Sequence, residues 1–129
     1  MLGRGMDHPV FRPAGISYLH IPTTDPQRSA SFYHAVFGWK IGGRPDHPSF
    51  EDGTGHVIGA WDSTVPVAGE AGIIIYIYVH SVVQTADLVK ASGGEIVKPP
   101  YPEGSLLVAT FRDPAGNLIG IWQQARQPG

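Results

Sequence analysis

The chain has 129 residues, of which 42% are hydrophobic and 16% charged, and its formal net charge is −2. This composition suits one folded domain with a core of its own and excludes a disordered chain. Because no basic run is present, neither nucleic acid nor a membrane surface is expected as a partner. The chain has no cysteine, which excludes disulfides, cysteine-ligated metals and thiol chemistry. With no apolar run of membrane-spanning length and no signal-peptide pattern, a cytoplasmic protein is expected.

The first half reads as a strand, a helix and three further strands. An apolar strand is expected over 16–23, after an N-terminal tail that covers 1–14. Asp25 is a suitable N-cap, Pro26 suits the first turn of a helix, and Gly38 is a suitable helix stop. Short strands are then expected at 39–41, 49–51 and 56–61.

The second half repeats letters of the first. FEDGTGHVIGAW, from Phe50 to Trp61, shares six of twelve letters with FRDPAGNLIGIW at an offset of 61 residues. The apolar strand near 17–25 has a counterpart near 74–81 at an offset of 56. Self-similarity of this kind predicts that the fold is built from two βαβββ repeats.

The two repeats are expected to fill a single α+β domain over 15–125, with repeat one at about 15–65 and repeat two at about 72–125. In the second repeat, Ser81 is expected to cap a helix over 82–92. Strands are expected at 72–79, 95–98, 105–111 and 117–123, with a stiff connection at Pro99, Pro100 and Pro102.

The period of two in a strand sorts its side chains between two faces. One face is aliphatic, as expected beneath packed helices, and the other is aromatic, polar and interrupted by glycines. The second face is the candidate ligand-binding site, because a glycine in mid-strand indicates that another group approaches the backbone. We assign eight residues to it: Tyr18, His20, Gly59, Trp61, Tyr76, Tyr78, Gly120 and Trp122. For the two tryptophans, a core position is expected for one and a lining position for the other.

The motifs TTDPQRSASFYHAVFGW and FRDPAGNLIGIW resemble the helix and the last strand of the vicinal oxygen chelate superfamily. That superfamily includes glyoxalase I, bleomycin-resistance proteins and extradiol dioxygenases. The resemblance runs from about Gly15 to Gln124. It implies a strongly curved, cup-shaped mixed sheet with helices on the outside and a small molecule bound in the cup. It also implies a homodimer.

In the metal-dependent members of that superfamily, four strand positions hold one divalent ion. Motif alignment places these positions here at Tyr18, Gly59, Ile74 and Gly120. None is a histidine or a carboxylate, whereas a divalent ion needs several converging nitrogen or oxygen ligands. The chain therefore resembles a glyoxalase-related branch that lacks the metal ligands. No cofactor is expected, and a divalent metal is expected only if its site has moved.

Two functions remain open on the sequence. One is a metal-free module that holds a small apolar or aromatic ligand in the cup, of which antibiotic sequestration is a special case. The other is a lyase, isomerase or dioxygenase in which His20 is a metal ligand or the general base, since histidine titrates near neutral pH. A histidine that only shapes the pocket through one hydrogen bond is the simpler alternative for His20.

Overall fold

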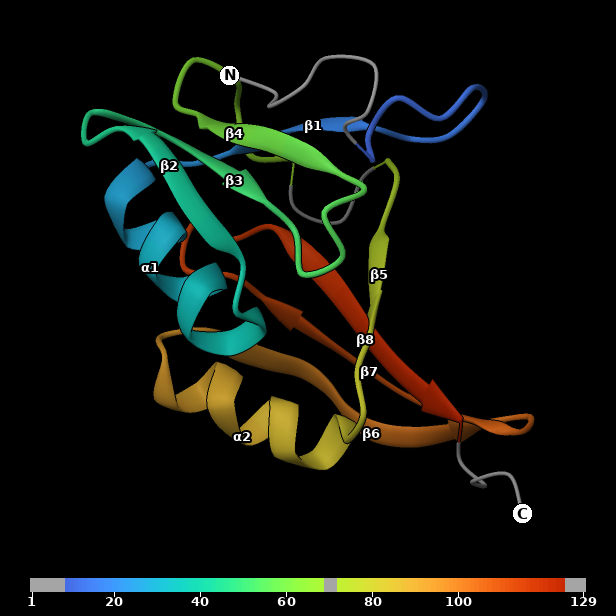
Figure 1. Cartoon of the computed structure of the whole chain (residues 1–129). Coiled ribbons are helices and arrows are strands. Elements are labelled where there is room, and N and C mark those ends of the chain that lie inside the picture. Colours follow the sequence, from blue (N-terminus) through green and yellow to red (C-terminus); the bar gives the residue numbers. More distant parts are fainter. Residues whose placement is uncertain (1–8, 69–71, 125–129) are drawn as a thin grey trace. The chain divides into compact units, whose positions relative to one another are not determined.

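The computed structural model describes residues 9–68 and 72–124 and divides the chain into two compact units (Figure 1). Unit 1 is Met1–Val65 and unit 2 is Pro66–Gly129. Each unit contains strand, helix and three strands in that order, so the α+β class and the two βαβββ repeats are confirmed. The single domain over 15–125 stays a prediction.

Unit 1 is a four-stranded mixed sheet with one helix. Its strands lie in the order β1-β4-β3-β2, with β1 parallel to β4 and the other neighbours antiparallel. The elements are β1 (Tyr18–Pro22), α1 (Pro26–Phe37), β2 (Lys40–Arg44), β3 (His47–Glu51) and β4 (Ile58–Asp62).

Unit 2 repeats this arrangement. Its strands lie in the order β5-β8-β7-β6, again with one parallel pair, β5 and β8, and antiparallel neighbours elsewhere. The elements are β5 (Ile75–Tyr78), α2 (Val82–Ala91), β6 (Glu95–Glu103), β7 (Leu106–Arg112) and β8 (Leu118–Gln124).

The ends of both helices are set by local side-chain chemistry. The Asp25 carboxylate accepts a hydrogen bond from the Arg28 amide at 3.2 Å. At the other end of α1, Gly38 adopts φ 71°, a left-handed conformation that ends a helix cheaply only at glycine. The Ser81 hydroxyl caps α2 by accepting from the Gln84 amide at 3.1 Å. The predicted caps of both helices are confirmed.

The core of unit 1 is a cluster of stacked aromatic rings beneath α1. Tyr33, on the helix, is fully buried and stacks on Trp39 with ring centroids 4.7 Å apart. Phe50 on β3 lies 4.6 Å from Trp39 and 4.9 Å from Trp61 on β4. Large aromatic side chains contribute much of the burial energy of a small unit, so this cluster holds α1 on the sheet.

The core of unit 2 is mainly aliphatic. Val82 and Val89 on α2 are fully buried. On the strands, Ile119 and Ile121 are 4% and 0% exposed, and Phe111 on β7 is also fully buried. The same element order is therefore stabilised by different core chemistry in the two units.

Strand β6 corrects one prediction. Pro99 and Pro100 lie inside this strand, not in a connection after it. Proline has no amide proton, but β6 is an edge strand with one neighbour, β7, and an edge tolerates the missing donor. The pairing with β7 shifts register between Lys98 and Tyr101, where these prolines lie.

Part of the predicted tail belongs to the fold of unit 1. Residues 1–8 of that tail lie outside the described residues. Val10 is only 6% exposed, and Arg12 donates through Nε to the carbonyl of Pro9 at 3.0 Å. The predicted domain start at 15 stays a prediction.

Candidate functional site

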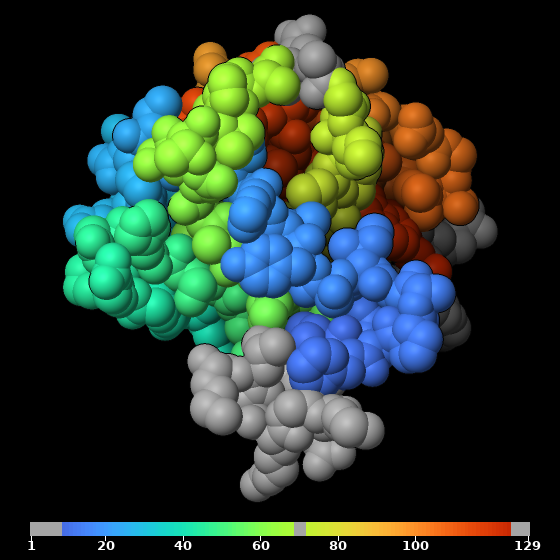
Figure 2. Space-filling model, turned by 90° about the horizontal axis from the view of Figure 1, so that it is seen from above, coloured from blue at the N-terminus to red at the C-terminus, as the bar shows by residue number. Residues whose placement is uncertain are grey.

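Each sheet has a face that packs on its helix and an opposite face, here called its open face. On the open face of unit 2, Tyr76 pairs with Gly120 and Tyr78 pairs with Trp122 across β5 and β8. Both tyrosines are 48% exposed. In Figure 2 the yellow atoms of β5 lie at the surface beside the red atoms of β8. The predicted sorting of side chains between faces is confirmed for this unit.

The gap at Gly120 is filled by an aromatic ring. A Cβ added at Gly120 would collide with the ring of Tyr76, which lies across the glycine. Next to it, Tyr78 and Trp122 make an edge-to-face contact with ring centroids 5.0 Å apart. We name this row of Tyr76, Tyr78, Gly120 and Trp122 the aromatic face. It offers flat apolar surface with phenol hydroxyls at its rim.

The predicted sheet face is wrong for two of the four site residues in unit 1. Tyr18 and His20 do lie on the open face, but Gly59 and Trp61 lie on the helix face. Gly59 pairs with Leu19, and Trp61 pairs with the buried Ile21. Trp61 is 2% exposed and belongs to the aromatic core.

One residue in a turn explains this error. Phe50 pairs with Gly59 and Phe111 pairs with Ile119, so the offset is 61 before the turn and 60 after it. The turn closes between Asp52 and Val57 in unit 1 but between Asp113 and Asn117 in unit 2. A shift of one residue sends every later side chain of a strand to the other face. The letters I-G-x-W match between the halves, but their positions in the sheets do not.

Gly59 serves close packing inside the core. A Cβ there would collide with the carbonyl oxygen of Leu19 and approach the Phe50 ring to 2.5 Å. The space left by the missing side chain is therefore taken by Phe50, not by a ligand. Below it, Nε1 of Trp61 is buried without a hydrogen-bond partner among the described residues, an uncommon cost in a core.

On the open face of unit 1, His20 lies beside a carboxylate that the sequence analysis missed. Its Nδ1 is 3.8 Å from Oδ2 of Asp62, the last residue of β4. Hydrogen bonds from the Thr64 hydroxyl, and then from the Thr64 amide, hold the pKa of Asp62 below its usual range. The charges of His20 and His47 act in the same direction and burial acts against it. The sequence signal was Asp-x-Thr at a strand end, which repeats the turn chemistry of Asp-x-Thr at 52–54.

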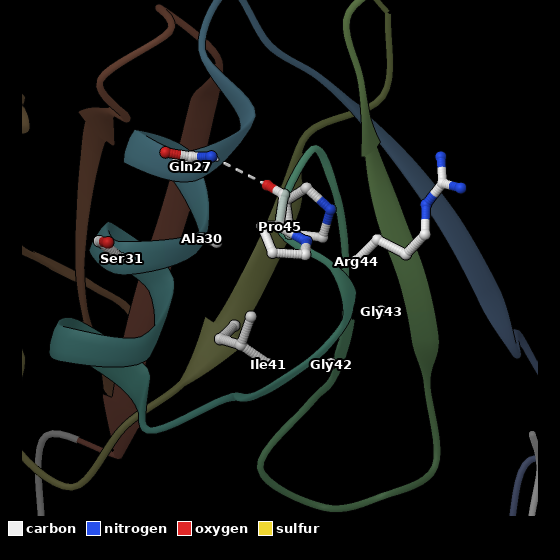
Figure 3. A pocket seen from close by; sticks show the side chains of 9 residues that line it. Gln27, Ala30, Ser31, Ile41, Gly42, Gly43, Arg44 and Pro45 are labelled. Carbon is white, nitrogen blue, oxygen red and sulfur yellow. Dashed lines mark hydrogen bonds between the residues drawn. The ribbon is translucent and has the colours of Figure 1, made fainter.

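A surface pocket of about 420 Å³ lies in unit 1 between α1 and the β2–β3 hairpin (Figure 3). Gln27 of α1 donates through Nε2 to the carbonyl of Pro45 at 3.0 Å. The Ile41 side chain points from β2 towards α1, whereas the Arg44 side chain points away from α1 (Figure 3). The lining combines apolar residues with the polar Gln27, Ser31 and Arg44, and no residue of this pocket was predicted as a site residue.

Residues 15–121 match the model of the glyoxalase/bleomycin resistance protein/dioxygenase superfamily. The chain belongs to this family. It is 29% identical over 131 residues to a putative glyoxylase, CFP32, of Mycobacterium bovis, covering 92% of this chain and 49% of that protein. The same identity and coverage hold for CFP32 of Mycobacterium tuberculosis. The chain thus spans about half the length of the curated relatives that it matches.

Solved structures of the family share the fold. A family enzyme from Burkholderia phytofirmans aligns with a TM-score of 0.72 at 20% identity, over 86% of this chain and 99% of that one. The fosfomycin resistance protein FosX of Mesorhizobium loti aligns with a TM-score of 0.70 at 17% identity, over 87% and 93%. At these identities the likeness shows the fold alone. In the chain described here, neither helix within 9–68 and 72–124 is long and apolar enough to cross a membrane.

The metal positions of the glyoxalase family do not fit a metal here. Tyr18, Ile74 and Gly120 lie on or beside the open faces of their own units, whereas Gly59 lies on the helix face of unit 1. Ala60, which the register makes the counterpart of Gly120, has no donor atom either. In the described part of the chain, no three histidine or carboxylate side chains group closely enough to hold an ion.

Proposed function

We propose that this protein binds a small apolar or aromatic molecule, without a metal, against the aromatic face of unit 2. The observation that carries the proposal is the pair of half-exposed tyrosines beside Trp122. Exposure of aromatic side chains to water on one sheet face is energetically unfavourable. Such side chains are common in ligand-binding sites. Membership of a family of small-molecule-binding proteins supports the same reading.

The contacts define which ligand suits this face. A ring can stack on Tyr76 or meet Trp122 edge-on, and the phenol hydroxyls can donate to or accept from a polar substituent. No charged side chain belongs to the row itself, so a neutral ligand fits better than an ionic one. Sequestration of an antibiotic with an aromatic group is a special case of this proposal.

A binding experiment tests the site. A library of neutral aromatic compounds is screened by thermal shift, and hits are titrated by calorimetry against the wild type and Trp122→Ala. Loss of one aromatic contact is expected to weaken binding by about tenfold, which corresponds to about 1.4 kcal/mol. Ile41→Ala, which alters the pocket of Figure 3, is the matched control. A ligand that responds to Ile41→Ala and not to Trp122→Ala would move the site to that pocket.

The metal-free part of the proposal has its own test. Metal content is measured by mass spectrometry on untagged protein purified without chelator and again after soaking in Zn²⁺, Ni²⁺, Mn²⁺ and Fe²⁺. Substoichiometric metal throughout is expected. One tightly held ion per chain would contradict the proposal and make His20 the first ligand to replace. Cytoplasmic location and homodimer formation stay predictions.

A second candidate function is an enzyme, a lyase, isomerase or dioxygenase, in which His20 is the general base. The observation in its favour is that His20, 59% exposed in its side chain, faces the carboxylate of Asp62. His20→Ala is expected to abolish turnover of a substrate while leaving the melting temperature nearly unchanged. Unchanged turnover in that variant would remove His20 from the chemistry.

A further inference from the structure

The pair of His20 and Asp62 joins two strands on the open face of unit 1. His20 pairs in the sheet with Ala60, two residues before Asp62, and both side chains of the pair point to the same face. At 3.8 Å, Nδ1 of His20 and Oδ2 of Asp62 are within ion-pair range but beyond hydrogen-bond length. Nε2, on the far side of the imidazole ring, has no hydrogen-bond partner among the described residues and is available to a ligand.

The Asp62 carboxylate is held in one orientation. Its Oδ1 accepts from the Thr64 amide at 2.8 Å and also from the Thr64 hydroxyl. Because both bonds use Oδ1, the other oxygen, Oδ2, is the one that faces His20. The same bonds favour the ionised form and lower the pKa of Asp62, so that the carboxylate stays negative at neutral pH.

Other charged groups compete little for that oxygen. His47, on β3, is close enough to act on Asp62 through its charge, but within 9–68 and 72–124 the side chain that forms an ion pair with Asp62 is His20. Tyr18 meets the His20 ring edge-on, with centroids 5.3 Å apart, and limits its rotation from the other side. The imidazole is therefore bounded by a carboxylate and a phenol ring.

We propose that Asp62, oriented by Thr64, is a positioning residue that keeps the proton of neutral His20 on Nδ1 and so makes Nε2 the proton acceptor of this face. A negative oxygen near Nδ1 favours an N–H there, which leaves the lone pair on Nε2. The inference rests on the second proposed function, in which His20 is a base. It goes beyond that function by naming the residues that select the reacting nitrogen.

The arrangement fits a small molecule with a weakly acidic proton, on a hydroxyl or on a carbon next to a carbonyl group. The O–H or C–H bond breaks, an N–H bond forms at Nε2, and the electron pair stays on the ligand as an alkoxide or enolate. The resulting imidazolium is stabilised by the Asp62 charge, more strongly once a ligand covers the pair and excludes water. Return of the proton to another atom completes an isomerisation without a co-reactant.

The tautomer of His20 can be measured without any substrate. Long-range ¹H–¹⁵N spectra of uniformly labelled protein at pH 8 report which nitrogen carries the proton, and His20→Gln assigns the signals. The wild type is expected to show mainly the Nδ1–H form at His20. Asp62→Asn is expected to shift the population towards Nε2–H, and Thr64→Val to shift it the same way by less.

The chain provides a matched control for these variants. Asp52 accepts from the amide and hydroxyl of Thr54, as Asp62 does from Thr64, but no ion pair joins it to His20. Thr54→Val is therefore expected to leave the His20 tautomer unchanged. An equal shift in Thr54→Val and Thr64→Val, or no shift in Asp62→Asn, would overturn the proposal.

Chemical reactivity gives a second readout. Diethyl pyrocarbonate acylates the free nitrogen of neutral imidazole, and peptide mass spectrometry gives its rate at each histidine. The rate at His20 is expected to fall severalfold in Asp62→Asn, because the free nitrogen is then Nδ1, which faces the side chain of residue 62 and is less accessible than Nε2. His56 and His80 are internal references. An unchanged rate would count against the positioning role even if the aromatic face binds its ligand. Conversely, a Trp122→Ala variant with normal ligand affinity would refute only the binding site of unit 2.

Discussion

The two units have the same order of elements but place the tryptophan of the repeated I-G-x-W letters on opposite faces of their sheets. In unit 1 the rings of Tyr33, Phe50 and Trp61 lie between α1 and the sheet. In unit 2 the rings of Tyr78 and Trp122 lie on the face away from the buried isoleucines of β8. The repeated I-G-x-W letters therefore encode part of a core in unit 1 and part of a surface in unit 2. A repeat in sequence predicts the order of elements better than it predicts the role of a residue.

The largest expected difference between the units is in the two tryptophans that the sequence aligned. Trp61→Ala is expected to lower the free energy of unfolding by about 3–5 kcal/mol, because it opens a cavity in a buried aromatic cluster. Trp122→Ala removes a partly exposed ring and is expected to cost about 1–2 kcal/mol. Urea denaturation of both variants checks the difference. Equal losses would mean that both tryptophans belong to a core.

Alanine substitutions at Gly59 and Gly120 are expected to show the same difference between the units, with smaller losses of stability. Gly59→Ala is expected to cost about 1–3 kcal/mol, because its Cβ would meet the Leu19 carbonyl and the Phe50 ring, neither of which can move freely. Gly120→Ala meets only the ring of Tyr76, which is half-exposed and can swing aside, so less than about 1 kcal/mol is expected.

Ligand binding is expected to reverse that ranking. Gly120→Ala displaces a ring of the aromatic face and is expected to weaken ligand binding, whereas Gly59→Ala is expected to leave the affinity of the folded protein unchanged. Thermal denaturation and calorimetric titration of the same two variants give both quantities. A Gly120→Ala variant that loses stability as strongly as Gly59→Ala would place Tyr76 in a rigid environment.

The smallest expected effect on stability comes from shortening the turn between β3 and β4, which is one residue longer than its counterpart in unit 2. Replacing residues 53–57 by Pro-Ala-Gly-Asn copies into unit 1 the shorter turn that follows Asp113. Because the buried faces fix the register, Trp61 is expected to stay in the core and stability to change by less than about 1 kcal/mol. Trp61 emission at a buried wavelength, in a variant with Trp39 and Trp122 replaced by phenylalanine, checks this. A red-shifted emission would show that turn length sets the register.

The sequence predicted the elements well because their signals are local. Asp25, Ser81 and Gly38 each act within one helical turn. These features depend on neighbours within four residues, so they can be read without knowing what packs against them.

The site was predicted only in part because it depends on pairing between strands. Gly59 and Trp61 were assigned to the wrong face because the repeat hid one extra turn residue. Asp62 was missed because its relation to His20 exists only through the parallel pairing of β1 and β4. In unit 2, the alternation of isoleucine and tyrosine within one strand placed Tyr76 and Tyr78 correctly.

The prolines of β6 have a consequence for how this protein behaves at high concentration. Pro99 and Pro100 lie on the border strand of the unit 2 sheet and present no amide protons there. A strand from another molecule cannot form a continuous ladder along that border, which is the contact that starts edge-to-edge aggregation. The register shift at the same place distorts the edge strand, so it is a poorer partner for a flat strand of another molecule. Along β6, these prolines oppose growth of the unit 2 sheet by addition of a further strand.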